Sequence, residues 1–193
     1  MVWSYTLSCM KEEISNGIHA PMHVFVPNAV YMITAGTLHK AHLYNTKRKL
    51  RSLQDVLFRI ADKRGWELRA WALFSNHYHL IAKSPDDGSL RRFIQHFHSE
   101  SAKALNRLDQ TSGRRVWYQY WDNCLTFESS YYARLNYVIN NPVHHQLVNA
   151  AELYPFCSAG WMAQNESRAF NRKVESYKYD QIDIDDPFVP KWR

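Results

Sequence analysis

Apolar and polar positions follow two different periods along the chain. Four short segments rich in β-branched, aliphatic and aromatic side chains predict strands, over residues 30–35, 66–74, 77–84 and 116–127. Two longer segments, 47–64 and 90–108, place apolar side chains every three to four residues, which predicts helices. Thr46 and Ser89 precede these helices and can accept hydrogen bonds from their first backbone N–H groups, so we expect both to be N-caps.

The pattern changes after the fourth strand. A third helix is predicted over residues 129–141, and we expect it to end there because Pro142 disfavours helix in the residue before it. Residues 143–193 show no sustained period and are expected to be irregular. Residues 1–28 are mixed in character and contain two prolines, so we expect them to form a loosely structured leader.

The first six predicted elements follow the order β-α-β-β-α-β. This order is typical of the ferredoxin-like, or RRM-like, α+β fold, an antiparallel sheet with helices packed on one face. The third predicted helix would follow this unit. Many unrelated functions use the fold, so the function has to be argued from individual residues.

Composition narrows the class of protein. The chain has 193 residues, of which 46% are hydrophobic, enough for one domain with a full core and too many for a disordered chain. No stretch reaches the roughly 18 apolar residues of a membrane span. The N-terminal residues lack a secretory signal pattern. Three widely spaced cysteines form no CxxC pair, so we expect reduced thiols and a cytoplasmic protein.

The charge adds a weak indication about the partner. The formal net charge is +6, and the chain carries seven Trp and twelve Tyr, which favours a polyanion whose bases can stack on aromatic rings. Basic residues lie near the start of the first helix and around the second. The candidate DNA-binding residues are Lys40, Arg48, Arg91, Arg92, Arg114 and Arg115. An ordinary solvated charged face is the alternative interpretation.

Two histidines give the sharpest local feature. His77 and His79 are two residues apart on a predicted strand, so their imidazoles share a face and could bind one divalent metal ion. The alternative is a hydrogen-bonded pair with no metal. His96 and His98 have the same spacing on a predicted helix, where they point about 200° apart, so we interpret them as non-ligands.

A tyrosine and an asparagine form the second feature. Tyr137 and Asn141 are four residues apart and share one face of the third predicted helix. A stabilised phenolate can act as a nucleophile, and an amide oxygen can bind Mg²⁺ or Mn²⁺. Packing of Tyr137 in the core is the alternative, and on spacing alone Tyr131 and Tyr132 are equally eligible.

These motifs together resemble a known family. AWALFSNHYHLIAKSP is similar to the HUH segment of the REP-associated tyrosine transposases, with Ser75 where the family often has proline. LNYVINNPVHHQLV resembles their nucleophile helix, with His144, His145 and Gln146 in place of a basic, a small and a glycine residue. The similarity covers about residues 28–162. We therefore expect a leader over 1–28, a catalytic domain over 29–162 and a C-terminal tail over 163–193.

The resemblance implies a role for each matching residue. His77, His79 and Asn141 would bind Mg²⁺ or Mn²⁺, and Tyr137 would be the nucleophile, a choice that spacing alone does not make. The implied activity is cleavage and rejoining of REP-like hairpin DNA with a single-stranded flank, through a 5′-phosphotyrosine, by a monomer or homodimer. The alternatives are a non-catalytic nucleic-acid-binding module, a metallohydrolase that uses water, and a replication or conjugation nickase.

Overall fold

The computed structural model describes residues 25–179 and 188–191. Within them the chain forms one four-stranded sheet and five α-helices. In chain order these are β1 (Val30–Thr37), α1 (Lys47–Lys63), β2 (Glu67–Leu73), β3 (His77–Lys83), α2 (Leu90–Leu108), β4 (Trp117–Leu125), α3 (Glu128–His144), α4 (Ala159–Asn165) and α5 (Arg168–Ser176). All strand pairs are antiparallel in the order β2-β3-β1-β4, which confirms the predicted ferredoxin-like α+β fold.

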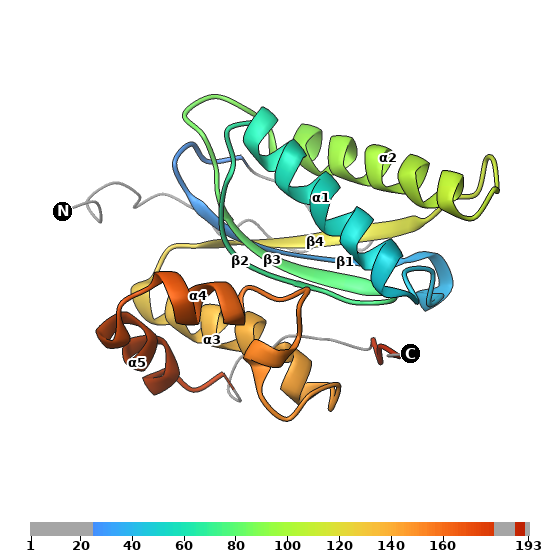
Figure 1. The fold of residues 1–193 in the computed structure, drawn as a ribbon. Helices are drawn as coiled ribbons and strands as arrows, with labels where there is room; N and C mark the ends of the chain where they lie inside the picture. Colours follow the sequence, from blue (N-terminus) through green and yellow to red (C-terminus); the bar gives the residue numbers. More distant parts are fainter. Residues whose placement is uncertain (1–24, 180–187, 192–193) are drawn as a thin grey trace, which may run out of the picture.

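The sheet separates two helical layers. Helices α1 and α2 cover one face as predicted, whereas α3, α4 and α5 lie on the other side (Figure 1). Both predicted N-caps are confirmed, because the Thr46 hydroxyl accepts from Lys49 N and the Ser89 hydroxyl accepts from Arg92 N. Both faces of β3 are therefore covered, and six of its seven residues are buried.

Helix α3 does not end before Pro142, and that prediction is wrong. The helix runs through the proline to His144. Proline lacks the N–H that would bond the carbonyl of Val138, four residues earlier. The thiol of Cys157 donates to this carbonyl at 3.8 Å and to the Ile139 carbonyl at 3.4 Å. Burial raises the pKa of Cys157 to about 12, so the thiol keeps the proton that it donates.

The segment after α3 is also more regular than predicted. Residues 143–193 were expected to be irregular, yet they contain α4 and α5. Helix α5 has few apolar residues. Its Phe170 meets Tyr132 of α3 at 6.0 Å, its Lys173 binds Glu128 of α3 at 2.5 Å, and its Val174 is buried. Most of the predicted leader over 1–28 lies outside the described residues. No described helix is long and apolar enough to cross a membrane.

Candidate metal and nucleophile site

His77 and His79 lie on the face of β3 that is turned toward α3. Both are fully buried, and their ring centroids are 5.1 Å apart. Tyr78 between them points to the opposite face, where its hydroxyl lies 2.8 Å from Nε2 of His98 on α2. Strand alternation thus places the two imidazoles together, as the spacing predicted.

The second HxH pair diverges as predicted. Nδ1 of His96 accepts a hydrogen bond from Nε of Arg64, whereas His98 turns to the sheet and stacks on Trp117 at 4.7 Å. Burial lowers the pKa of His98 to about 3, so this ring stays neutral. His98 therefore packs between α2 and the sheet, on the face opposite to that of His77.

A neighbouring side chain orients His77. The Asn76 amide nitrogen donates to the backbone carbonyls of Lys40 and Val189, both at 3.4 Å. The amide oxygen of Asn76 is therefore the atom that accepts from Nδ1 of His77, at 2.9 Å. A proton on Nδ1 leaves Nε2 with its lone pair, which is the state that a metal ligand requires.

His79 is also oriented by a hydrogen bond, from a residue of β1. Thr34 lies directly opposite His79 in the β1–β3 register, and its hydroxyl is 2.8 Å from Nδ1 of His79. Both imidazoles thus use Nδ1 within the sheet. The sequence alone does not indicate Thr34 or Asn76, because each role depends on a hydrogen bond that forms only in the folded protein.

Helix α3 brings three side chains to this face at intervals of four residues. The Tyr137 ring meets the His79 ring edge-on at 5.3 Å, and the His145 ring meets His77 at 5.1 Å. Asn141 lies between them on the same side of the helix. Its side chain is fully buried, and neither Oδ1 nor Nδ2 has a hydrogen-bond partner among residues 25–179 and 188–191. A buried amide in this state is suited to a ligand that binds through oxygen.

The donor set fits a divalent ion. One nitrogen each from His77, His79 and His145 lies within 4.8 Å of the other two. Such a triad, with two buried imidazoles and one half-buried imidazole, can hold a metal ion. His145 is not among the ligands expected from the sequence, although its position four residues after Asn141 is a signal that indicates it.

The structure separates Tyr137 from the other two tyrosines of α3. Tyr132 stacks on Tyr177 at 5.1 Å and lies under the Lys173 ammonium at 4.4 Å. Tyr131 packs against Tyr132, and burial raises its pKa. Of these three phenols, Tyr137 is the one whose ring contacts the His77–His79 pair.

Two phenylalanines enclose His77. Phe74 stacks on it at 4.6 Å, and Phe188 stacks on it at 5.0 Å. Gly36 lies opposite His77 in the β1–β3 register, and a Cβ at this position would come within 2.2 Å of the Phe188 ring. The glycine thus leaves the space that Phe188 occupies beside the imidazole.

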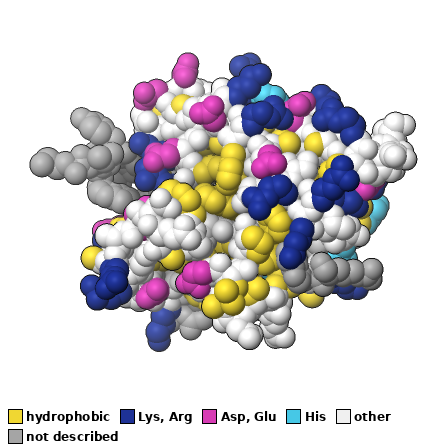
Figure 2. All heavy atoms as spheres, viewed as in Figure 1, with side chains coloured by type: hydrophobic (Ala, Val, Ile, Leu, Met, Phe, Trp, Pro, Cys, Tyr) yellow, Lys and Arg dark blue, Asp and Glu magenta, His cyan; other side chains and the backbone are white. Residues whose placement is uncertain are grey.

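The predicted DNA-binding residues are not gathered around this site. Arg48, Arg91 and Arg92 are exposed at the starts of α1 and α2, on the opposite face of the sheet, and Arg115 is exposed just before β4. On the side of the molecule drawn in Figure 2, which includes both helical layers, lysine and arginine side chains alternate with acidic and apolar ones. Lys40 is the member nearest the site, with its ammonium 5.5 Å from the Phe188 ring.

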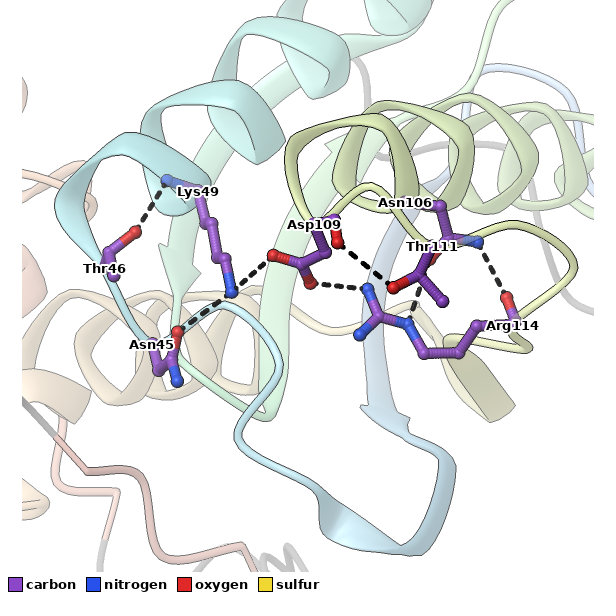
Figure 3. Close-up of polar contacts among 7 residues, drawn as sticks. All are labelled: Asn45, Thr46, Lys49, Asn106, Asp109, Thr111 and Arg114. Atoms are coloured by element: carbon purple, nitrogen blue, oxygen red, sulfur yellow. Dashed lines mark hydrogen bonds and ion pairs between the residues drawn. The ribbon is translucent and has the colours of Figure 1, made fainter.

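Arg114 has a structural role that we had not predicted. Its guanidinium binds Asp109 at 2.7 Å and Asn106 at 3.0 Å. Asp109 also binds Lys49 at 2.8 Å, so the network ties the end of α2 to the start of α1 (Figure 3). The guanidinium of Arg114 is therefore engaged in contacts within the chain, unlike the exposed arginines of the predicted DNA-binding set.

Comparison with known proteins adds a family and a fold. Residues 25–140 match the family model of the IS200-like transposases. The solved structure of a REP-associated tyrosine transposase bound to a REP hairpin superposes with a TM-score of 0.64 at 16% identity, over 91% of this chain and 99% of that one. A candidate transposase from Deinococcus radiodurans R1 gives a TM-score of 0.44 at 18% identity, over 66% and 97% of the two chains. No curated protein matches the sequence.

Proposed function

Because the chain belongs to the IS200-like transposase family, we propose that it is a metal-dependent single-stranded DNA endonuclease and strand transferase. The observation that carries this proposal is the edge-on contact of Tyr137 with His79, in one buried cluster with His77 and Asn141. A core tyrosine needs no such partners. The cluster supports a nucleophile beside a metal centre.

Tyr137 would supply the attacking atom. Its phenol oxygen loses a proton and forms a bond to a backbone phosphorus, while the bond from phosphorus to the 3′ oxygen breaks. The products are a 5′-phosphotyrosine and a free 3′-OH, which takes up a proton. Attack by a 3′-OH on the phosphotyrosine reverses these steps and joins new ends. No ATP is needed, because one phosphate ester replaces another.

His77, His79 and Asn141 are the residues that would hold Mg²⁺ or Mn²⁺. When bound, the ion would polarise the phosphoryl group and stabilise its charge in the transition state. Asn76 keeps His77 in the required tautomer, and the hydrogen bond from Thr34 orients the His79 ring. Phe74 and Phe188 exclude water from one side of the site, which strengthens electrostatic interactions within it.

The hydrogen bond to His79 gives a test of this arrangement. Thr34→Val removes the hydroxyl with little change in volume, and we expect Mn²⁺ affinity to fall by about 10- to 100-fold. Calorimetric titration would measure it. Thr111→Val is the matched control, because the Thr111 hydroxyl donates to the carbonyl of Asp109 at the end of α2, on the other face of the sheet. Equal Mn²⁺ affinities for the Thr34 variant and the unmodified protein would contradict the assigned role.

We propose hairpin DNA of the REP type with a single-stranded flank as the substrate, in the cytoplasm. A fold neighbour is bound to a REP hairpin, which supports this choice. Exposed Arg48, Arg91, Arg92 and Arg115 could contact phosphates of the stem, and Lys40 is close enough to the site to contact the flank. A non-catalytic nucleic-acid-binding module on this fold would leave the contacts around Tyr137 without a purpose.

The proposal is tested by trapping the covalent intermediate. The full chain is incubated with Mn²⁺ and hairpins that carry single-stranded flanks and a label at the 3′ end, taken from the sequence around its own gene. We expect a labelled protein band on a denaturing gel that protease removes and chelation before mixing prevents. Fully paired DNA should give no band. Absence of the adduct for every flanked hairpin would overturn the proposed cleavage.

A further inference from the structure

A third imidazole stands beside the His77–His79 pair. The His145 ring is 5.1 Å from that of His77, and the two planes are nearly perpendicular, at 78°. One nitrogen of His145 lies within 4.8 Å of one nitrogen each of His77 and His79. Three imidazoles that converge from two separate elements form a donor set different from two histidines and an amide.

The fold holds His145 in this position from two sides. It is the C-cap of α3, and its backbone N–H donates to the carbonyl of Asn141 at 2.9 Å. Phe74 contacts both imidazoles, with ring distances of 4.6 Å to His77 and 5.2 Å to His145. Although His145 is half-buried as a residue, its Nε2 atom is buried. The ring thus turns inward while its neighbour His144 is exposed.

We propose that His145 is a third imidazole ligand of the ion, and that the site consequently selects first-row transition ions such as Mn²⁺, Co²⁺ or Zn²⁺ over Mg²⁺. This inference rests on the proposed function, which places an ion at His77, His79 and Asn141. Mg²⁺ prefers oxygen ligands and dehydrates reluctantly, whereas imidazole nitrogen suits transition ions. A set of three imidazole nitrogens and one amide oxygen therefore favours transition ions over Mg²⁺.

The separation of the nitrogens is compatible with this role. Bonds from imidazole nitrogen to such ions are about 2.1 Å long, so two ligands of one ion lie at most about 4.2 Å apart. The observed limit of 4.8 Å requires the rings to close by less than about 1 Å. His145 lies at the end of α3, where a small rotation of its side chain disturbs no interior turn of the helix.

Metal titration of the full chain in the absence of DNA tests the inference. The unmodified protein is titrated with Co²⁺, followed by the visible spectrum of the bound ion, and with Mg²⁺ in competition. For His145→Ala we expect Co²⁺ affinity to fall at least about tenfold, and the ratio of Co²⁺ to Mg²⁺ affinity to fall with it. His144→Ala is the matched control and should bind Co²⁺ as the unmodified protein does.

The outcomes separate the two proposals. If His77→Ala abolishes Co²⁺ binding and His145→Ala leaves both affinity and spectrum unchanged, His145 is not a ligand and the two-histidine site stands. If neither substitution changes Co²⁺ binding, both the inference about His145 and the metal site of the proposed function are wrong. Circular dichroism in chelator checks folding, and His145→Gln repeats the test if the alanine variant unfolds.

A second measurement does not depend on affinity. Each histidine that binds Co²⁺ through one nitrogen keeps a proton on the other, and the paramagnetic ion shifts that N–H signal far downfield in the proton NMR spectrum. We expect three such exchangeable signals from the unmodified protein and two from His145→Ala. Two signals from the unmodified protein would overturn the inference.

Discussion

Tyr137→Phe is expected to eliminate the covalent protein–DNA adduct and to lower strand cleavage by at least about a thousandfold. The substitution removes one oxygen and leaves the ring, so the edge-on packing against His79 should persist. Binding of hairpin DNA should therefore stay close to that of the unmodified protein. A denaturing gel measures the adduct, and a filter or mobility-shift assay measures binding.

Two tyrosines of the same helix supply the control for this experiment. Tyr131→Phe and Tyr132→Phe remove the same atom from rings that contact each other, away from the histidines. Both variants should form the adduct. If Tyr137→Phe still becomes linked to DNA while Tyr131→Phe or Tyr132→Phe does not, the nucleophile has been assigned to the wrong residue.

His77→Ala is expected to lower cleavage by at least about a hundredfold, because the ion it helps to hold would contribute several kcal/mol to transition-state stabilisation. The same variant should lose the stabilisation that Mn²⁺ gives to the folded chain, since an ion that binds only the native state raises Tm. Melting curves with and without Mn²⁺ measure this difference independently of DNA.

The second HxH pair provides the matched control for His77. His96→Ala removes an imidazole of the same motif spacing whose partner is Arg64 on the other side of the sheet. It should keep both the Mn²⁺-dependent rise in Tm and the adduct. Alanine at position 77 also leaves a space between Phe74 and Phe188, so a lower Tm in chelator is expected and does not bear on the metal. A normal Mn²⁺ response in His77→Ala would contradict its role as a ligand.

The sequence allowed the sheet and the first two helices to be predicted because their signals are local. Thr46 and Ser89 mark helix starts through bonds to residues three positions later, and strand alternation alone separates Tyr78 from its neighbours. The same alternation was sufficient to predict that His77 and His79 share one face of the sheet. Choosing Tyr137 among three tyrosines required the resemblance to a family, and the contact with His79 now gives a geometric reason for the same choice.

Other features depended on contacts between distant residues. Thr34 acquires its role only through the register of β1 against β3, and His145 only because α3 docks across the sheet. Helix α5 has too few apolar positions to stand out, and its contacts with α3 combine the Phe170–Tyr132 ring pair with the Lys173–Glu128 ion pair. Proline generally disfavours helix, but at Pro142 tertiary packing outweighs this local preference and α3 continues to His144.

The pairing of Pro142 with Cys157 also constrains how this sequence can evolve. With proline at position 142, loss of the thiol leaves the buried carbonyl of Val138 without its donor, at a cost of about 1 kcal/mol. With any other residue there, the backbone N–H would take over and Cys157 could change at less cost. The order of substitutions therefore matters: a lineage that first replaces Pro142 can then drift at position 157, whereas the reverse order passes through a less stable intermediate.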